Sequence, residues 1–305
     1  MLSSYLRMKY KKDKETIAVN GIKGFNLEKY YSIAEKIHGI QAGLITFIAQ
    51  ANVGKTALLT CFAMDLLLSN DGLRILFFTF DDTRSEIIDN FVAQMSGLSK
   101  NKINCNWDRT EQQDGLILKN FKTLESYSQK DLLELKTFED VSTLDAFEEC
   151  LRENKAKYRK LAVFIDGVAL METKFDNDDV KAEGLKSKRL KQLCNELNVP
   201  ILISLETRKG EFHRPNKNSG KGSGRYAYDS RLVLCLSEVD EQYKEQRCHP
   251  DILIDCDKSK FGNKFKEFAT MKGHLADIVL LKDEERIKCK ERMRIYDKER
   301  LRRNN

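Results

Sequence analysis

"AQANVGKTALL", residues 49–59, is the stretch that decides the fold of this 305-residue chain. It contains the Gly-Lys-Thr of the pattern G-x-x-x-x-G-K-[ST], although Ala49 stands where the pattern has its first glycine. A buried strand is predicted directly before it and a helix directly after it, which is the context that a phosphate-binding loop requires. The sequence therefore predicts a nucleotide site at this point.

The loop positions have different expected tasks. Backbone N–H groups, backed by the helix N-terminus, should point at the β-phosphate. Lys55 would reach the β- and γ-oxygens of ATP, and the Thr56 hydroxyl would coordinate Mg²⁺. Ala49 need only turn out of the strand, which alanine can do if its φ is negative. The candidate nucleotide-binding residues are Ala49, Gln50, Ala51, Asn52, Val53, Gly54, Lys55, Thr56 and Ala57.

A carboxylate on a neighbouring strand should hold the same metal ion. The segment "LAVFID" (161–166) is an apolar run that leads to Asp166. Asp166 would lie at the carboxyl end of its strand, where α/β sheets bind ligands. The loop and Asp166 together predict a P-loop ATPase with Thr56 and Asp166 as its metal ligands.

Apolar segments alternate with helical patterns along the chain, and five of these segments are almost continuously hydrophobic, as parallel strands covered by helices are. The five segments are 43–49, 74–80, 161–166, 200–206 and 231–237. A helix that starts at Lys55 and is stopped by Asn70 and Gly72 separates the first two. We therefore predict an α/β fold with a doubly wound, mostly parallel sheet and helices on both faces. Segments 251–256 and 265–271 are expected to pair as a C-terminal β-hairpin about 260–264.

Composition excludes several classes of protein. Charged residues make up 33% and hydrophobic residues 41% of the chain, and no apolar run approaches the roughly 20 residues of a membrane span. The N-terminus carries charges where a signal peptide has its apolar core. We expect a cytoplasmic protein without a membrane partner. The eight cysteines lack any C-x-x-C pair and are interpreted as reduced thiols in the core.

The two ends differ from the middle. Residues 1–20 form a basic arm or linker, residues 21–280 the ATPase domain, and residues 281–305 a charged tail. The tail mixes basic and acidic side chains with few apolar ones, which favours a solvated helix with opposite-sign pairs. A DNA-contacting or ring-docking role for the tail is the alternative. The net charge of +6 is compatible with a polyanionic partner but does not require one.

Several segments around these motifs resemble one family. "GFNLEKYYSIAEKIHGIQAG" (24–43) precedes the loop, and "ILFFTFDDTRSEIIDNF" (75–91), "LKQLCNELNVPILISLETR" (190–208) and "DILIDCDKSKFGNKFKEFATM" (251–271) follow in order. These segments, with the two motifs, resemble the RecA-like C-terminal motor domain of DnaB-type replicative DNA helicases over roughly residues 20–275. That family also has a non-glycine residue at the head of its loop. The separate N-terminal helical domain of the helicases has no counterpart in the roughly 20 residues that precede the match.

The resemblance assigns roles to two acidic positions. Asp81 stands where the family has the glutamate that polarises the attacking water, and it is one methylene shorter. Asp82 could share that role or cap the helix "TRSEIIDNF". Glu206 stands where the family has a glutamine that senses the γ-phosphate. A carboxylate there would be repelled unless it is protonated or paired with a cation.

The resemblance also implies residues that act on a neighbouring subunit. Lys258 and Lys260 occupy the positions of the final hairpin that touch the neighbour's ATP, and Lys260 replaces an arginine. Lysine supplies the charge without the planar, bidentate fork of arginine. A solvated hairpin edge is the alternative for both lysines. The candidate catalytic residues are Lys55, Asp81, Glu206, Lys258 and Lys260.

The loop at 207–225 combines cations with glycine and asparagine, which implies mobility. Its position after a strand of the sheet suits a phosphodiester backbone, which asks for charge rather than sequence readout. A basic surface loop without a ligand is the alternative. The candidate DNA-binding residues are Arg208, Lys209, Arg214, Lys217, Lys221 and Arg225.

The resemblance implies an ATP-dependent DNA helicase or translocase of the 5′–3′ type that uses ATP and Mg²⁺. Its implied partners are single-stranded DNA in replication, further copies of the chain in a ring of six, and a primase or loader. Asp81, Glu206 and Lys260 alter the three parts that carry out hydrolysis. They favour the alternative, an ATP-gated DNA-binding or assembly protein with weak hydrolysis or none.

Overall fold

Nine strands form one twisted sheet in the part of the chain that the computed structural model describes. That part comprises residues 6–11, 14, 17, 21–105, 107–175, 178–207, 214–220, 224–240, 250–272 and 276–303. The strands are β1 (Gly43–Ala49), β2 (Arg74–Thr79), β3 (Leu133–Thr137), β4 (Leu161–Asp166), β5 (Pro200–Glu206), β6 (Leu232–Glu238), β7 (Asp251–Ser259), β8 (Lys266–Lys272) and β9 (Asp277–Leu280).

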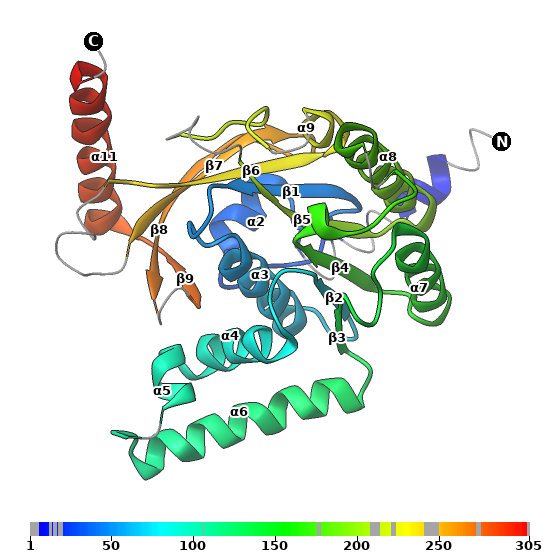
Figure 1. The fold of residues 1–305 in the computed structure, drawn as a ribbon, viewed down its shortest axis with the longest axis horizontal. Coiled ribbons are helices and arrows are strands. Elements are labelled where there is room, and N and C mark those ends of the chain that lie inside the picture. Colours follow the sequence, from blue (N-terminus) through cyan, green and yellow to red (C-terminus); the bar gives the residue numbers. More distant parts are fainter. Residues whose placement is uncertain are drawn as a thin grey trace.

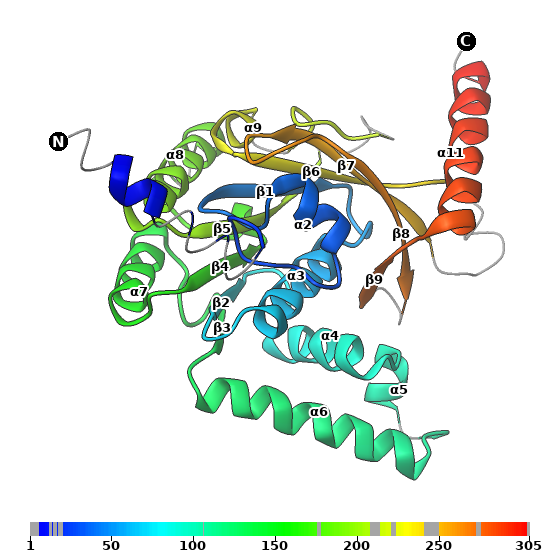
Figure 2. The same cartoon turned by 180° about the vertical axis from the view of Figure 1, so that it is seen from behind.

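Helices cover this sheet and extend beyond two of its edges (Figures 1 and 2). The helices are α2 (Tyr31–Ile37), α3 (Lys55–Ser69), α4 (Arg84–Ser96), α5 (Lys100–Asn104), α6 (Glu111–Gln129), α7 (Leu144–Lys157), the 3₁₀ turn η1 (Val168–Leu170), α8 (Asp179–Leu197), α9 (Arg225–Asp229) and α11 (Asp283–Arg303). In the described ranges, no helix is long and apolar enough to cross a membrane.

The strand order is β3-β2-β4-β5-β1-β6-β7-β8-β9. The strands from β3 to β6 run parallel, while β7, β8 and β9 continue the sheet in antiparallel pairs. This order confirms the predicted doubly wound, mostly parallel sheet and its C-terminal hairpin. The carboxyl ends of β1, β2, β4 and β5 therefore meet along one edge of the sheet, where ligands bind in such folds.

Two hydrophobic layers lie on opposite faces of the sheet. In β1, Ile45 and Phe47 pack into the layer beneath α2, α3 and α4, whereas Leu44 and Ile48 pack into the layer beneath α7 and α8. The alternation follows from the two-residue period of a strand. All seven residues of β1 are buried, which confirms the expectation that the central strands are covered on both faces.

The structure adds two strands that the sequence pattern did not reveal. β3 pairs with β2 at one edge of the sheet, and β9 pairs with β8 at the other. β3 reads Leu-Glu-Leu-Lys-Thr and is only partly buried, so its hydrophobic signal is weak. β9 has four residues, which is too short for a periodicity to appear.

The charged tail forms a helix, as predicted, but one side of α11 is docked rather than solvated. Cys289 is fully buried against Val239, Leu253 and Phe268. Arg292 pairs with the carboxylates of Asp251 and Asp240. The expectation of a wholly solvated tail is therefore wrong, because a few apolar side chains at helical spacing suffice to bind α11 to β8.

Candidate nucleotide-binding site

The loop between β1 and α3 has the backbone shape of an anion cradle. Asn52 and Gly54 both have positive φ, +62° and +93°. Left-handed residues within a turn direct successive N–H groups towards one point, where an anion can bind. Ala49 is the last, fully buried residue of β1 and has no positive φ, so this position does not require glycine.

The amino end of α3 completes this cradle. Gly54 is the N-cap, and no side chain in the described part of the chain caps the helix or brings an acidic group into its first turn. The N–H groups of that turn and the positive end of the helix dipole therefore favour an anion. A phosphate group fits this end of the helix.

Lys55 is half-buried beside the loop. Its ammonium donates a hydrogen bond to the carbonyl of Gln50 at 2.9 Å, so the side chain folds back over the cradle. Burial lowers the pKa of Lys55, while the charges of Glu206, Asp166 and Asp81 raise it in part. The structure thus brings together four of the expected site residues, which come from α3, β4, β5 and the end of β2.

Asp166 and Thr56, the two residues predicted to hold a metal ion, contact each other. The Thr56 hydroxyl donates to one carboxylate oxygen of Asp166 at 2.6 Å, and the Ser204 hydroxyl donates to the other. Ser204 in turn accepts from the backbone N–H of Gly167 at 2.9 Å. Burial raises the pKa of Asp166, and the hydrogen bonds from Ser204 and Thr56 oppose that rise. Ser204, which sequence reasoning missed, holds the carboxylate in place.

These ligands suit Mg²⁺ only together with a nucleotide. A hydroxyl and a carboxylate are the hard oxygen donors that Mg²⁺ prefers, and the ion usually completes its shell with water and phosphate oxygens. No group of three or more His, Cys, Asp or Glu side chains within the described ranges could hold a metal by itself. The fit is therefore to a metal ion shared with a triphosphate.

Asp81 follows β2 and lies next to Gly167. β2 and β4 pair so that Thr79 is opposite Asp166, and the N–H of Phe80 donates to the carbonyl of Asp166 at 3.0 Å. Gly167 has φ +73°, and a Cβ placed on it would lie 3.3 Å from the backbone nitrogen of Asp81. The glycine keeps the exposed Asp81 close to the metal-ligand carboxylate. No sequence signal identified Gly167.

Asp82 is not the N-cap of α4. Thr83 is the cap: its hydroxyl accepts from the N–H of Glu86, and the Glu86 carboxylate accepts from the N–H of Thr83. Asp82 is half-buried, and burial together with the charges of Asp166, Glu86 and Asp81 raises its pKa to about 6. Its carboxylate therefore belongs to the acidic group at the end of β2.

β8 and β9 pack behind the phosphate loop. A Cβ on Gly54 would lie 2.6 Å from the sulfur of Met271 and 3.6 Å from a methyl carbon of Ile278. Gly54 is thus required both by its left-handed conformation and by the side chains behind it.

Lys258 and Lys260 lie away from the phosphate loop of their own chain. Lys258, in β7, is opposite Val233 of β6, and the N–H of Lys260 donates to the carbonyl of Arg231. These partners adjoin the amino-terminal half of β1, whereas the phosphate loop follows its carboxyl end. Neither lysine is placed to touch a nucleotide in its own subunit.

Lys258 instead fastens α9. Its ammonium donates to the carbonyls of Ala227 and Tyr228 at 2.6 and 2.8 Å. On the other side of this short helix, Asp229 accepts from Ser187 and Lys191 of α8 at 2.8 and 2.7 Å. Burial lowers the pKa of Lys258, as do the charges of nearby lysines. α9 is thus held between α8 and β7.

The basic loop after β5 is only partly described. Arg208, Lys209 and Lys221 lie outside the described residues. Residues 216–219 form a turn closed by hydrogen bonds between Asn216 and Ser219. The loop starts beside the phosphate cradle, because the N–H of Thr207 donates to the carbonyl of Ala49 at 3.0 Å.

The three described candidates for DNA contact differ in their surroundings. Arg214 donates to the carbonyls of Glu238 and Val239 and to the carboxylate of Asp297 in α11, so its guanidinium is used within the chain. The guanidinium of Arg225 lies against Gly184 of α8. Lys217 is exposed.

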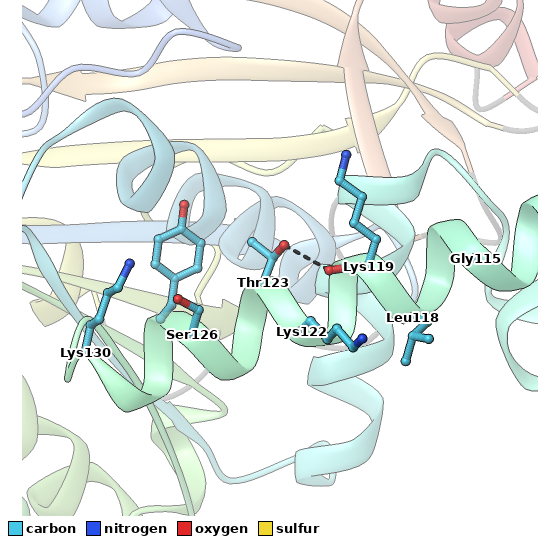
Figure 3. A pocket seen from close by; sticks show the side chains of 8 residues that line it. Gly115, Leu118, Lys119, Lys122, Thr123, Ser126 and Lys130 are labelled. Carbon is cyan, nitrogen blue, oxygen red and sulfur yellow. Dashed lines mark hydrogen bonds between the residues drawn. The ribbon is translucent and has the colours of Figure 1, made fainter.

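A hollow on α6 lies apart from these groups. Figure 3 shows Lys119, Lys122 and Lys130 around it, with the Thr123 hydroxyl bonded back to the carbonyl of Lys119 at 2.9 Å. α6 packs on α4 and β3. The hollow therefore has no part in the cradle between β1 and α3.

The family model of the DnaB-like helicase C-terminal domain matches residues 27–271. The chain belongs to this family. DnaB-like helicase domains are nucleotide-hydrolysing motors that use ATP with Mg²⁺, which agrees with the cradle and the paired Thr56 and Asp166. No curated protein matches the chain at the sequence level.

Solved structures support the DnaB-like fold. A solved ATPase domain matches with a TM-score of 0.80 and 16% identity over 92% of this chain and 99% of that one. A structure of a DnaB-like replicative helicase and its interactions with primase matches with a TM-score of 0.76 and 17% identity. That match covers 92% of this chain and 66% of the other, so this chain spans about two thirds of the length of that helicase.

Proposed function

We propose that the chain is the motor of an ATP-driven, DnaB-type helicase that moves along single-stranded DNA during replication. Residues 21–280 would form the ATPase domain, between a basic arm (1–20) and the tail helix (281–305). Copies would pack side by side in a ring, most simply of six, with a primase or loader as a further partner. The proposal includes 5′–3′ movement and a cytoplasmic location.

One observation carries this proposal. The phosphate cradle and its acidic groups lie at the carboxyl end of the parallel strands, while Lys258 and Lys260 lie towards the opposite end. On this proposal, one chain would hold both halves of an ATP site without being able to join them. Side-by-side packing of two chains would bring the lysines of one to the triphosphate of the other.

The residues in the cradle then have defined tasks. Lys55 would exchange the carbonyl of Gln50 for phosphate oxygens when ATP binds. Thr56 and Asp166 would hold Mg²⁺, which supplies charge stabilisation to the transferring phosphoryl group. Asp81 would orient the attacking water. Glu206, whose charge raises the pKa of Lys55, would respond to the γ-phosphate. Lys258 and Lys260 of the next subunit would stabilise the transition state.

The experiment that tests this proposal is ATP turnover by the full chain with and without single-stranded DNA. We expect turnover that rises on addition of DNA, and strand separation on a forked duplex. Lys55→Ala should abolish turnover because the phosphate oxygens lose their charged partner. Tight MgATP binding without turnover would contradict the motor.

The DNA contact is proposed for the loop that begins at Thr207. Removing the charges of Arg208 and Lys209 together should weaken DNA binding and reduce the slope of log K against log salt by about 1.4, at roughly 0.7 per phosphate contact on a single strand. Lys221 and Arg225 are further candidates. An unchanged slope would remove this loop from the DNA path.

A second function remains, and a specific observation favours it. Asp81, Glu206 and Lys260 each depart from the family's hydrolytic groups, and Lys258 is bonded to α9 rather than exposed. These features suit an ATP-gated DNA-binding or assembly protein with slow hydrolysis. Such a protein would bind MgATP and associate, without turnover that responds to DNA.

A further inference from the structure

Lys217, in the loop after β5, lies against β7. Its backbone N–H donates to a carboxylate oxygen of Asp257 at 2.8 Å, and Asp257 is the residue before Lys258 in β7. The turn at 216–219 closes on itself through bonds of the Asn216 and Ser219 groups. This point of the basic loop is therefore fastened to β7.

A bulge in β7 explains how the loop and Lys258 meet. The register between β6 and β7 shifts between Val233 and Leu234, so Asp257 has no partner on β6. A bulge re-aims the side chains next to it. Here the Asp257 carboxylate takes the N–H of Lys217 while the next side chain, Lys258, reaches α9.

Four lysines gather around this bulge, and two of them have ionic or aromatic partners already. Lys191 pairs with Asp229 at 2.7 Å and lies over the ring of Tyr228. Lys258 donates to the carbonyls of α9. Lys217 and Lys260 are exposed, and within the described part of the chain neither pairs with a carboxylate.

The charges of this group act on one another. After burial, Lys260 and Lys217 lower the pKa of Lys258 most; Asp229 raises it, and Lys191 lowers it to a lesser degree. The carboxylate of Asp229 pairs with Lys191, and that of Asp257 accepts from the backbone of Lys217, so the repulsion within the group is offset only in part. In the proposed function Lys258 and Lys260 meet a triphosphate across a subunit contact, and Lys217, which shares their group, would then meet the same anion.

We propose that Lys217 contacts the triphosphate bound to the neighbouring subunit, together with Lys258 and Lys260, rather than the DNA. The inference rests on the proposed function, in which these two lysines act across the contact between copies. It adds a third cation to that set, and this cation is supplied by the loop after β5. The same loop would then join the neighbour's nucleotide to the DNA path through residues only a few positions apart.

The test compares Lys217→Ala with Lys266→Ala, which removes one exposed charge from the adjacent strand β8. The alanine at 217 leaves the backbone bond to Asp257 intact. We expect DNA-stimulated turnover to fall about tenfold for Lys217→Ala, the effect of losing one charge-assisted hydrogen bond, and to be unchanged for Lys266→Ala. Lys217→Arg should restore most of the loss. DNA affinity and its salt slope should equal those of the wild type.

Mixed assemblies decide whether Lys217 acts across the contact. Lys217→Ala subunits keep an intact cradle, and Lys55→Ala subunits keep an intact Lys217. Mixing the two should give more turnover than the sum of the separate variants, because some contacts then join an intact cradle to an intact lysine. No recovery on mixing would overturn the inference.

Two other results would also overturn it. If Lys217→Ala flattens the salt slope of DNA binding and leaves turnover at saturating DNA unchanged, Lys217 holds DNA. If the wild type neither turns over ATP nor associates, both the proposed function and this inference are contradicted. Wild-type turnover with a fully active Lys217→Ala variant would overturn only the role of Lys217.

Discussion

Substitutions of Asp81 test most directly whether a carboxylate at this position orients the attacking water. The structure places it beside Gly167 at the end of β2, near the charge of Lys55. Its carboxylate is one methylene shorter than the family's glutamate, and a displacement of about 1 Å can cost roughly a hundredfold in rate.

We expect Asp81→Glu to raise the turnover number, by up to about a hundredfold, because the longer side chain returns the carboxylate to the attacking water. Steady-state turnover at saturating MgATP and DNA is the measurement. Asp81→Asn, which removes the charge at constant size, should lower turnover. A drop in the glutamate variant would mean that another group positions the water.

The raised pKa of Asp82 predicts that the stability of the fold depends on pH. Because its pKa is raised from 3.8 to about 6, the folded chain holds this proton more tightly than the unfolded chain. Stability must therefore fall as the pH rises from about 4 to 6, and the full penalty applies above that range.

Asp82→Asn removes this penalty. We expect its melting temperature to exceed that of the wild type by a few degrees at pH 7.5, since partial exposure screens the effect to about 1 kcal/mol or less. The difference should shrink as the pH is lowered towards 4.5. Thermal denaturation without nucleotide or Mg²⁺ measures it, and a difference independent of pH would contradict the assignment.

The docking of α11 is a property of the whole element. Cys289 fills the space between the helix and the sheet, with Val239, Leu253 and Phe268 around it, whereas Ile287 two residues earlier is exposed. The Arg292 side chain bonds the Cys289 thiol and could bond a hydroxyl there too, so burying the more polar serine costs about 1 kcal/mol.

Cys289→Ser should therefore lower the melting temperature by a few degrees, at roughly 2–4 °C per kcal/mol for a domain of this size. Ile287→Ser is the matched control and should leave the melting temperature nearly unchanged. Differential scanning calorimetry compares them. Equal effects of the two substitutions would show that α11 is not docked in solution.

The same elements indicate what the sequence could and could not predict. β1, β4 and β5 have the predicted bounds because each is a continuous apolar run that ends at a turn. α6 was not predicted: its buried positions, Ile117, Asn120 and Leu124, include a polar residue.

Contacts between distant segments could not be predicted from the sequence either. Lys55, Thr56 and Asp166 could be identified because a local motif fixes the backbone around them. The bond of Lys258 to α9, the bond of Arg214 to α11 and the bond of Lys217 to β7 join residues 30 to 83 positions apart. No local pattern reports such pairs, so the sequence did not reveal these partners of Arg214 and Lys217, whose contact with DNA stays a prediction.

At the scale of the whole molecule, the phosphate cradle and the pair Lys258 and Lys260 lie towards opposite ends of the sheet. A contact between subunits that depends on bound nucleotide can therefore be tested by changing the lysines alone. Lys258→Ala with Lys260→Ala alters groups that lie away from the cradle of the same chain. We expect MgATP to bind each isolated subunit with unchanged affinity, while turnover falls at least a hundredfold. This loss is smaller than the one that follows removal of an arginine finger.

Sedimentation with and without MgATP provides the second measurement. The wild type should associate when MgATP is added, and the double variant should associate less. Lys55→Ala, which keeps the lysines and loses the phosphate contact, should show the same defect. Full association of the double variant would place the subunit contact elsewhere on the molecule.

The methionine behind Gly54 links the shape of this nucleotide site to a buried side chain. Met271 lies in the core, and its sulfur occupies the space that even one carbon on Gly54 would need. An oxygen added to that sulfur would make the side chain larger and polar, and would press on the turn that cradles phosphate. Because Met271 is fully buried, peroxide would reach it only through local opening of the fold; the resulting sulfoxide should then impair ATP binding from behind the loop, and a reductase specific for methionine sulfoxide should restore it.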